Sequence, residues 1–330
     1  MQTTLSSSEK IISRSRTASS FLRNNASVIL IYAFVLLIAG IASVYAENFR
    51  TPSNLLSILR QSIILGLIAI GQSLVVLTGG MDISMDMVAR TVALVVATLF
   101  AANNSNPWLI VPLIALGLLI GAVLGGMNGL LITRTHANPF IITFGIASLL
   151  RGVNLAIATT PIRGIPTQYQ SMYTAKIGIV PVCVIVMALI WFLAYIFTTR
   201  TSLGRHIFAV GGSERVAQLS GIRINRTMIA TYVLASAFAA AAGLFFLART
   251  GVGDPGTAEG LTFQSVVAVA VGGISLYGGR GSIIGTLGGV LLLSLLSNVF
   301  NLMQVSIFYQ QLLLGLVVLI AVAAYKSRSA

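Results

Sequence analysis

Apolar runs of about 20 residues recur along the whole sequence, and each is long enough to cross the roughly 30 Å hydrocarbon core of a membrane as an α-helix. Hydrophobic side chains make up 56% of the chain and charged ones only 8%, so few polar groups remain to form a water-facing surface. The runs are continuous rather than alternating, which favours helices over a transmembrane β-barrel. The sequence therefore predicts an all-α, polytopic membrane helical bundle.

About ten transmembrane helices are predicted, several of them short or interrupted by glycine, after a polar N-terminal segment, residues 1–25. They cover residues 26–46, 58–78, 83–101, 108–133, 139–158, 177–198, 227–249, 263–277, 282–303 and 307–325. Residues 47–57 are expected to lie at the interface, and residues 326–330 form a tail. The first run exceeds the about 7 to 15 apolar residues of a signal peptide, so we expect an uncleaved span. Eight spans with re-entrant pieces are the alternative.

The net charge of +13 comes from basic residues that cluster between the predicted spans. With both termini in the cytoplasm, thirteen of the 20 basic residues fall on the cytoplasmic side and five on the other. The positive-inside rule supports this orientation, so the charge gives no reason to expect a nucleic-acid partner. We expect a multi-pass membrane protein with both termini in the cytoplasm.

The longest polar segment inside the chain, residues 199–226, carries five arginines and must lie in water at a membrane face. Within it, residues 213–220 are predicted to form a short helix. Ser213 can cap its start, and Gly221 can adopt the left-handed conformation that ends it. Val216 and Leu219 would then present a small apolar face. The segment is either an ordinary arginine-rich loop or a docking surface for a soluble partner.

Several short motifs occur in a fixed order from residue 54 to the carboxyl end. They are Gly79-Gly80-Met81-Asp82-Ile83-Ser84, Asn128-Gly129, Arg151-Gly152, Thr201-Ser202-Leu203-Gly204-Arg205, Leu219-Ser220-Gly221-Ile222 and Gly272-Gly273-Ile274-Ser275-Leu276. In this order they resemble the permease subunits of monosaccharide-type ABC importers, the ribose-importer family within the branched-chain amino acid and ribose permease superfamily. Each motif alone is weak, but six in register over so long a chain are specific.

The resemblance implies a pair of permeases that take up a monosaccharide delivered by an extracytoplasmic sugar-binding protein. Each permease would offer a coupling helix to a cytoplasmic ABC ATPase. Carried over by position, the ATPase-coupling residues are Gly204, Arg205, Gly212, Ser213, Glu214, Arg215, Ala217, Leu219, Ser220 and Gly221. An aspartate at Ala217 or Leu219 is expected to uncouple ATP hydrolysis from transport. The second permease would be an identical or a related chain, and both would lie among membrane lipid.

The sequence predicts no cofactor or metal bound by this chain. A Walker A motif is missing, and the nearest glycine-rich run, residues 278–282, lacks its lysine, so ATP would be used by a separate ATPase. The single cysteine, Cys183, lies in an apolar run, and the two histidines, His136 and His206, lie in different loops. No nucleophile and base stand out at membrane depth, which argues against an intramembrane enzyme. An ion-coupled secondary carrier is the alternative function.

Polar residues inside or beside the predicted spans are the candidates for the translocation pathway. Asp86 and Arg90 lie four residues apart on one helix face, where they can pair, either lining the pathway or forming an internal clamp. Asp82 is expected to cap the third span rather than to contact substrate. The full set is Asp82, Ser84, Asp86, Arg90, Asn128, Arg151 and Asn154.

Small residues predict where two of the helices meet. Gly121, Gly125 and Gly129 form a small-xxx-small ridge, which is typical of close helix packing in membranes. The two halves of the chain also echo each other. Gln72-Ser73 precedes Gly79-Gly80, and Gln264-Ser265 precedes Gly272-Gly273, as in a transporter with internal repeats.

Overall fold

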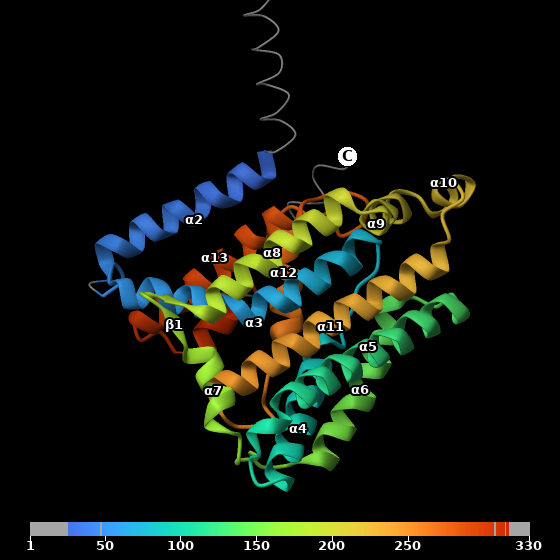
Figure 1. Cartoon of the computed structure of the whole chain (residues 1–330). Coiled ribbons are helices and arrows are strands. Elements are labelled where there is room, and N and C mark those ends of the chain that lie inside the picture. Colours follow the sequence, from blue (N-terminus) through green and yellow to red (C-terminus); the bar gives the residue numbers. More distant parts are fainter. Residues whose placement is uncertain (1–25, 47, 307, 314, 317–330) are drawn as a thin grey trace, which may run out of the picture.

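The computed structural model describes residues 26–46, 48–306, 308–313, 315 and 316, most of which lie in helices (Figure 1). The elements are α2 (Ala26–Tyr45), α3 (Pro52–Leu77), α4 (Met85–Ala102), a 3₁₀ turn (Pro107–Leu109), α5 (Ile110–Thr135), α6 (Pro139–Ile157), α7 (Thr167–Thr174), β1 (Lys176–Ile177), β2 (Val180–Pro181), α8 (Val182–Arg200), α9 (Ser202–Gly212), α10 (Glu214–Leu219), α11 (Ile224–Thr250), α12 (Leu261–Val271) and α13 (Ile283–Leu302). Eight of these helices are long and apolar enough to span a membrane, which confirms the predicted polytopic bundle.

Helices α3 and α4 form the centre of the bundle. In α3 83% of the span is buried and in α4 72%, whereas the spans of α2, α5, α6 and α8 are 28% buried or less. The outer helices therefore turn large apolar surfaces away from the protein, as lipid requires. A hydrogen bond from the Asn54 backbone N–H to the Thr51 hydroxyl and a proline at position 52 begin α3, so residues 52–57 belong to this helix rather than to an interfacial piece.

The predicted glycine ridge of α5 packs against α11, and the prediction is confirmed. A Cβ atom on Gly125 would overlap the backbone carbonyl of Tyr232, and one on Gly121 would lie 2.7 Å from the carbonyl oxygen of Ser236. Gly129 meets the backbone of Ile229 in the same way. Close approach of two helix backbones replaces the hydrophobic effect, which cannot drive helix association in lipid.

Helix α12 is a half-helix, and the span predicted over residues 263–277 is wrong in length. It ends at Gly272, followed by Gly273 at φ +88°, because only glycine readily adopts that backbone conformation. Its 11 residues rise about 16 Å, half of a bilayer core. Helix α3 likewise ends just before Gly79, so the sequence echo corresponds to two helices that stop at glycine pairs. The Ser73 and Thr286 hydroxyls hydrogen bond at 3.0 Å beside these stops.

The other boundaries depart from prediction at two further places. The sixth span begins with the hairpin β1–β2, so the membrane helix α8 starts at Val182. Of the predicted tenth span, residues 308–313, 315 and 316 are helical and the rest lies outside the described residues. The predicted segments 1–25 and 326–330 also lie outside them.

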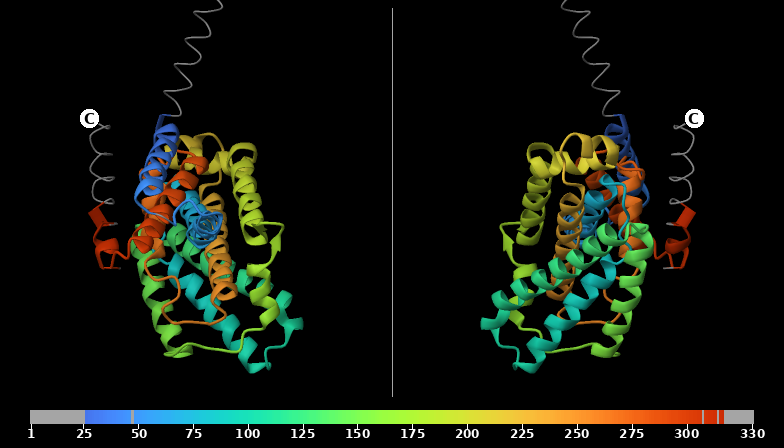
Figure 2. Two further views of the ribbon diagram at one scale, coloured as in Figure 1. Left: turned by 90° about the vertical axis from the view of Figure 1, so that its left-hand side faces the viewer. Right: turned by 90° about the vertical axis from the view of Figure 1, so that its right-hand side faces the viewer.

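The two ends of the bundle differ. Helices α9 and α10 join the end of α8 to the start of α11, whereas α7 lies at the opposite ends of both helices (Figures 1 and 2). We call these the α10 end and the α7 end. The Tyr169 hydroxyl of α7 donates to the Leu244 carbonyl at 2.8 Å, and that of Tyr173 donates to the Arg60 carbonyl at 3.1 Å. Burial raises the pKa of both tyrosines, so both remain protonated donors that tie α7 to α11 and α3.

Candidate functional site

The polar segment 199–226 is folded into two short helices and not into a loop with one helix. Helix α9 continues through Gly211 and Gly212 to Ser213, the cap of α10. Ile207 and Val210 of α9 are buried against the bundle. Tertiary packing of this apolar face therefore overrides the low helix propensity of the two glycines.

The second of these helices, α10, has the ends that were predicted. The Ser213 hydroxyl accepts a hydrogen bond from the Val216 backbone N–H at 3.4 Å, which caps the start. Gly221 has φ +81°, and the N–H of Ile222 returns to the Ala217 carbonyl at 3.1 Å, which ends the helix in a Schellman-like turn. Glu214 occupies the first turn, at the positive end of the helix dipole.

The outer face of α10 is apolar and unpacked. Leu219 is 82% exposed and Val216 is 61% exposed, while Ala217 between them is only 2% exposed and faces the bundle. Exposed arginines, Arg215 and Arg223, flank this face. Because Ala217 is buried, an aspartate there would disturb the packing of α10 against the bundle as well as any docking. A substitution at Leu219, which is exposed, tests docking alone.

The remaining residues of the predicted coupling set divide into exposed and packed positions. Gly212, Ser220 and Arg205 are exposed, and the Arg205 guanidinium donates to the Arg200 carbonyl at 3.1 Å. Gly204 is buried, and a side chain at this position would collide with the end of α8. Gly204 therefore sets the sharp turn from α8 into α9, whereas the others form the surface.

Behind α10, three glycine-containing segments meet backbone to backbone, and we call their meeting point the glycine junction. A Cβ on Gly211 of α9 would overlap the Leu77 carbonyl at the end of α3 and lie 2.6 Å from the Gly279 nitrogen. The Gly279 N–H donates to that same Leu77 carbonyl at 3.0 Å. A Cβ on Gly278 would lie 2.7 Å from the Gly79 nitrogen. The junction thus joins α9 to α3 and to the loop between α12 and α13.

The linker from α3 to α4 is held by a buried polar cluster. One Asp82 carboxylate oxygen accepts from the Ser84 backbone N–H at 2.8 Å and from the Ser84 hydroxyl at 2.6 Å. The Asn128 amide of α5 donates to the Ser84 hydroxyl at 2.9 Å. All three residues are completely buried. Asp82 therefore fixes the turn into α4 through its hydrogen bonds to Ser84, the residue immediately before α4. No side chain of this cluster faces an open cavity.

Asp86 and Arg90 do not form the pair that their spacing suggests: within the described residues the structure records no ion pair between them. The Asp86 backbone N–H donates to the Thr262 hydroxyl at 2.9 Å, and the Arg90 Nε donates to the Thr257 carbonyl at 3.0 Å. Both side chains are buried, at 8% and 7% exposure. The contacts lead from α4 to α12 and the loop before it, because the α11–α12 loop folds over the start of α4.

We expect Arg90→Met to destabilise the folded chain. The change removes the hydrogen bond to Thr257 and leaves its buried carbonyl without that partner, which costs about 1–3 kcal/mol. The exposed Arg151 offers a matched control, because Arg151→Met removes the same charge without a buried partner. Unfolding midpoints in an SDS titration would measure the difference, and equal midpoints for the two variants would contradict the structural role of Arg90.

The last two pathway candidates, both on α6, differ in burial. Asn154 is 2% exposed, and its amide donates to the Met87 carbonyl of α4 at 3.4 Å. Arg151 is exposed on the outside of the helix. The seven predicted pathway residues therefore do not line one common cavity in this conformation.

One known protein family matches most of this chain. The family described as the branched-chain amino acid transport system permease component matches residues 54–322, which is most of the chain. The chain belongs to this family. No solved structure matches it.

Curated relatives of the permease match over most of their own length. The ribose import permease protein RbsC of Bacillus subtilis (strain 168) is 39% identical over 301 residues, 90% of this chain and 91% of that protein. RbsC of Escherichia coli (strain K12) is 33% identical over 87% of this chain and 90% of that protein. The fructose import permease protein FrcC of Rhizobium meliloti is 30% identical, covering 92% and 86%.

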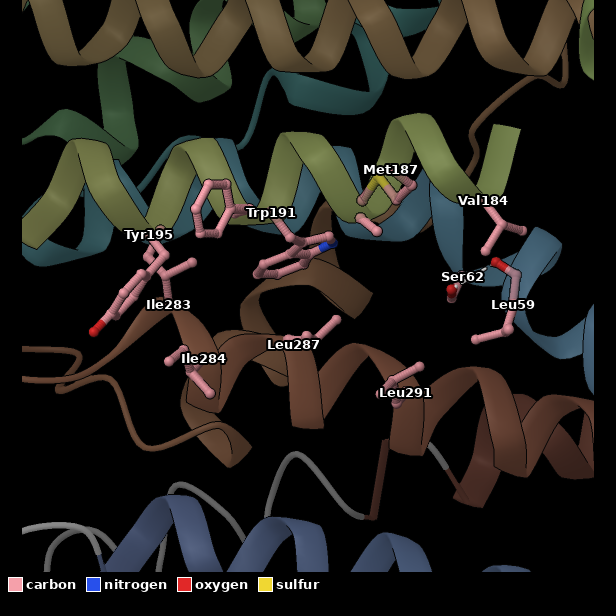
Figure 3. A pocket seen from close by; sticks show the side chains of 12 residues that line it. Leu59, Ser62, Val184, Met187, Trp191, Tyr195, Ile283, Ile284, Leu287 and Leu291 are labelled. Carbon is pink, nitrogen blue, oxygen red and sulfur yellow. Dashed lines mark hydrogen bonds between the residues drawn. The ribbon is translucent and has the colours of Figure 1, made fainter. Parts of the chain in front are cut away.

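One cavity of the described permease is an apolar groove. It encloses about 470 Å³ between α3, α8 and α13. Figure 3 shows Met187, Trp191 and Tyr195 of α8 on one side and Leu287 and Leu291 of α13 on the other. Few hydrogen-bonding groups line this groove, so it suits an apolar group far better than a sugar hydroxyl.

The glycine junction is a feature of the permease that the sequence did not predict. The sequence feature that could have indicated it is three Gly-Gly pairs, at residues 79–80, 211–212 and 278–279. Each pair lies in a different segment of the chain, so the sequence does not show that they are neighbours. Only the packing of three distant segments shows that the pairs meet.

Proposed function

We propose that the permease is the membrane-spanning subunit of an ATP-driven, binding-protein-dependent importer that moves a monosaccharide into the cytoplasm. The single observation that carries the proposal is α10, a capped helix that holds Leu219 and Val216 out from the bundle without a partner in the described chain. An apolar face flanked by arginines suits a soluble protein partner, here an ABC ATPase. The ribose and fructose named for the relatives suggest the substrate class.

The orientation follows from charge. Five exposed arginines, from Arg200 to Arg226, gather around α9 and α10. Basic loops stay on the cytoplasmic side of a bacterial inner membrane, so the α10 end is cytoplasmic and the α7 end receives the sugar-binding protein. The same orientation puts both termini in the cytoplasm. A second permease copy, identical or related, would complete the pathway.

This chain needs only to transmit a movement, because ATP is bound and hydrolysed by the partner ATPase. ATP can shift the transporter between two conformations only by favouring one of them. A displacement of α10 would reach α9 directly through Ser213, and then α3 and the α12–α13 loop through the glycine junction. Helix α9 ends at Gly212, and α3 is followed by Gly79. Because glycine is conformationally permissive, the angles between these helices and the segments that follow them can change at those points.

Reconstitution tests the proposed function. The permease, an ATPase that copurifies with it and the sugar-binding protein are placed in liposomes, and uptake of labelled D-ribose is measured. ATP-dependent uptake that stops with vanadate supports the proposal. Uptake that survives vanadate but collapses with an uncoupler supports an ion-coupled carrier instead.

A further inference from the structure

A second, smaller cavity lies at the α7 end, where α3, α11, α12 and α13 come together. It encloses about 180 Å³, and polar side chains from all four helices line it. These are Gln61, Arg249, Gln264, Ser294 and Ser297. None of the seven predicted pathway residues lines this cavity.

The polar groups of this cavity are free to bind a ligand. In the part of the chain that the structure describes, no hydrogen bond is recorded for the side chains of Gln61, Gln264 or Arg249. Ser294 is 6% exposed, and its hydroxyl likewise has no recorded partner. Each glutamine amide supplies donors and an acceptor, and each serine hydroxyl supplies both. Together they match a ligand with several hydroxyl groups.

The rest of the lining suits the apolar face of a sugar ring. Phe246 of α11 and Leu261 of α12 border the cavity beside the polar groups. A mixed lining of apolar side chains and a few placed polar groups is the usual composition of a small-molecule site. With Arg249 exposed at the α7 end and no carboxylate in the lining, nothing in it favours a cation.

We propose that this cavity is the site on the permease that takes the sugar after its release from the binding protein. The inference rests on the proposed function and adds to it the residues and the size of the substrate. At about 180 Å³ the cavity is smaller than the about 300–1,000 Å³ of sites for drug-sized ligands, so its size matches a single sugar ring better than a disaccharide.

A buried glutamine deeper in α3 indicates how the pathway continues. Gln72 is completely buried, and both atoms of its amide lack a partner within the described residues. It follows Gln61 by 11 residues, which returns to nearly the same helix face about 16 Å further along the axis. Gln72 lies about two turns before Gly79, one of the glycines of the junction. In the described conformation Gln72 is closed off from solvent, and a movement at the junction would act on α3, the helix that bears both Gln61 and Gln72.

The double variant Gln61→Ala and Gln264→Ala tests the site. In the reconstituted importer, D-ribose uptake is expected to fall about tenfold or more, because two hydrogen-bonding groups are lost. ATPase stimulation by the loaded binding protein is expected to stay within about twofold, since α10 and the glycine junction are untouched. Gln168→Ala, the same change at an exposed residue of α7, is the matched control.

A direct measurement on the purified permease separates this inference from the proposed function. Gln264→Cys in a Cys183→Ala background is labelled with a water-soluble maleimide, and excess D-ribose is expected to slow labelling while the disaccharide sucrose does not. Wild-type uptake by the double variant, or labelling that D-ribose leaves unchanged, contradicts the site. If the wild type shows no ATP-dependent uptake, the proposed function fails, and the labelling result still decides whether the cavity binds a sugar.

Discussion

Leu219→Asp on α10 is expected to reduce ATP-dependent uptake about 100-fold while the permease still inserts and folds. Leu219 is 82% exposed and contacts little in its own chain, so the substitution leaves the bundle intact. In the docked complex the new carboxylate would be buried without a partner, at a cost of about 3 kcal/mol or more. That cost corresponds to about 100-fold in binding. Uptake and copurification of the ATPase are measured on the same membranes.

Ser202→Asp is the matched control for this variant. Ser202 is an exposed residue at the start of α9, so the change adds the same charge at the same end of the bundle but away from α10. Its uptake is expected to match that of the wild type. Ala217→Asp, by contrast, should lower the unfolding midpoint, because Ala217 faces the bundle. If the Leu219 variant transports normally, α10 is not the docking helix.

Gly211→Ala is expected to weaken both folding and transport, because it forces the glycine junction apart. The added methyl group would overlap the Leu77 carbonyl and displace the backbone of Gly279. Over-packing of a close contact costs about 1–3 kcal/mol, and here the displaced atoms are backbone atoms that cannot rotate away. We expect an unfolding midpoint below that of the wild type and uptake reduced by about tenfold or more.

The neighbouring glycine gives a sharp comparison. A Cβ on Gly212 meets nothing within 4 Å, so Gly212→Ala makes the same chemical change in the same helix without a collision. Its unfolding midpoint should equal or exceed that of the wild type, because alanine favours a helix over glycine. Equal behaviour of the two variants in the SDS titration would show that the junction does not constrain α9. A Gly211 variant that is stable but transports poorly would show that the junction contributes to coupling and not to the stability of the fold.

Where a feature depends on neighbouring residues, the sequence was sufficient to predict it. The caps of α10 at Ser213 and Gly221 follow from side chains and backbone conformations a few residues apart. The membrane spans follow from runs of apolar residues, and the α5 ridge follows from glycines at four-residue spacing. These properties are local along the chain or along one helix face.

Where a feature depends on which helices meet, the sequence alone was insufficient. Arg90 was expected to pair with Asp86 and instead bonds Thr257, because the loop before α12 folds back onto α4. The predicted pathway residues are mostly buried or turned outward, and the polar cavity draws Gln61 and Gln264 from helices about 200 residues apart. Burial and cavity shape arise from contacts between distant segments, and a pattern within one segment does not contain them. The sequence by itself determined a helical membrane bundle with a capped, exposed α10, while only the tertiary structure decided how α10 is joined to α3 and where a sugar could enter.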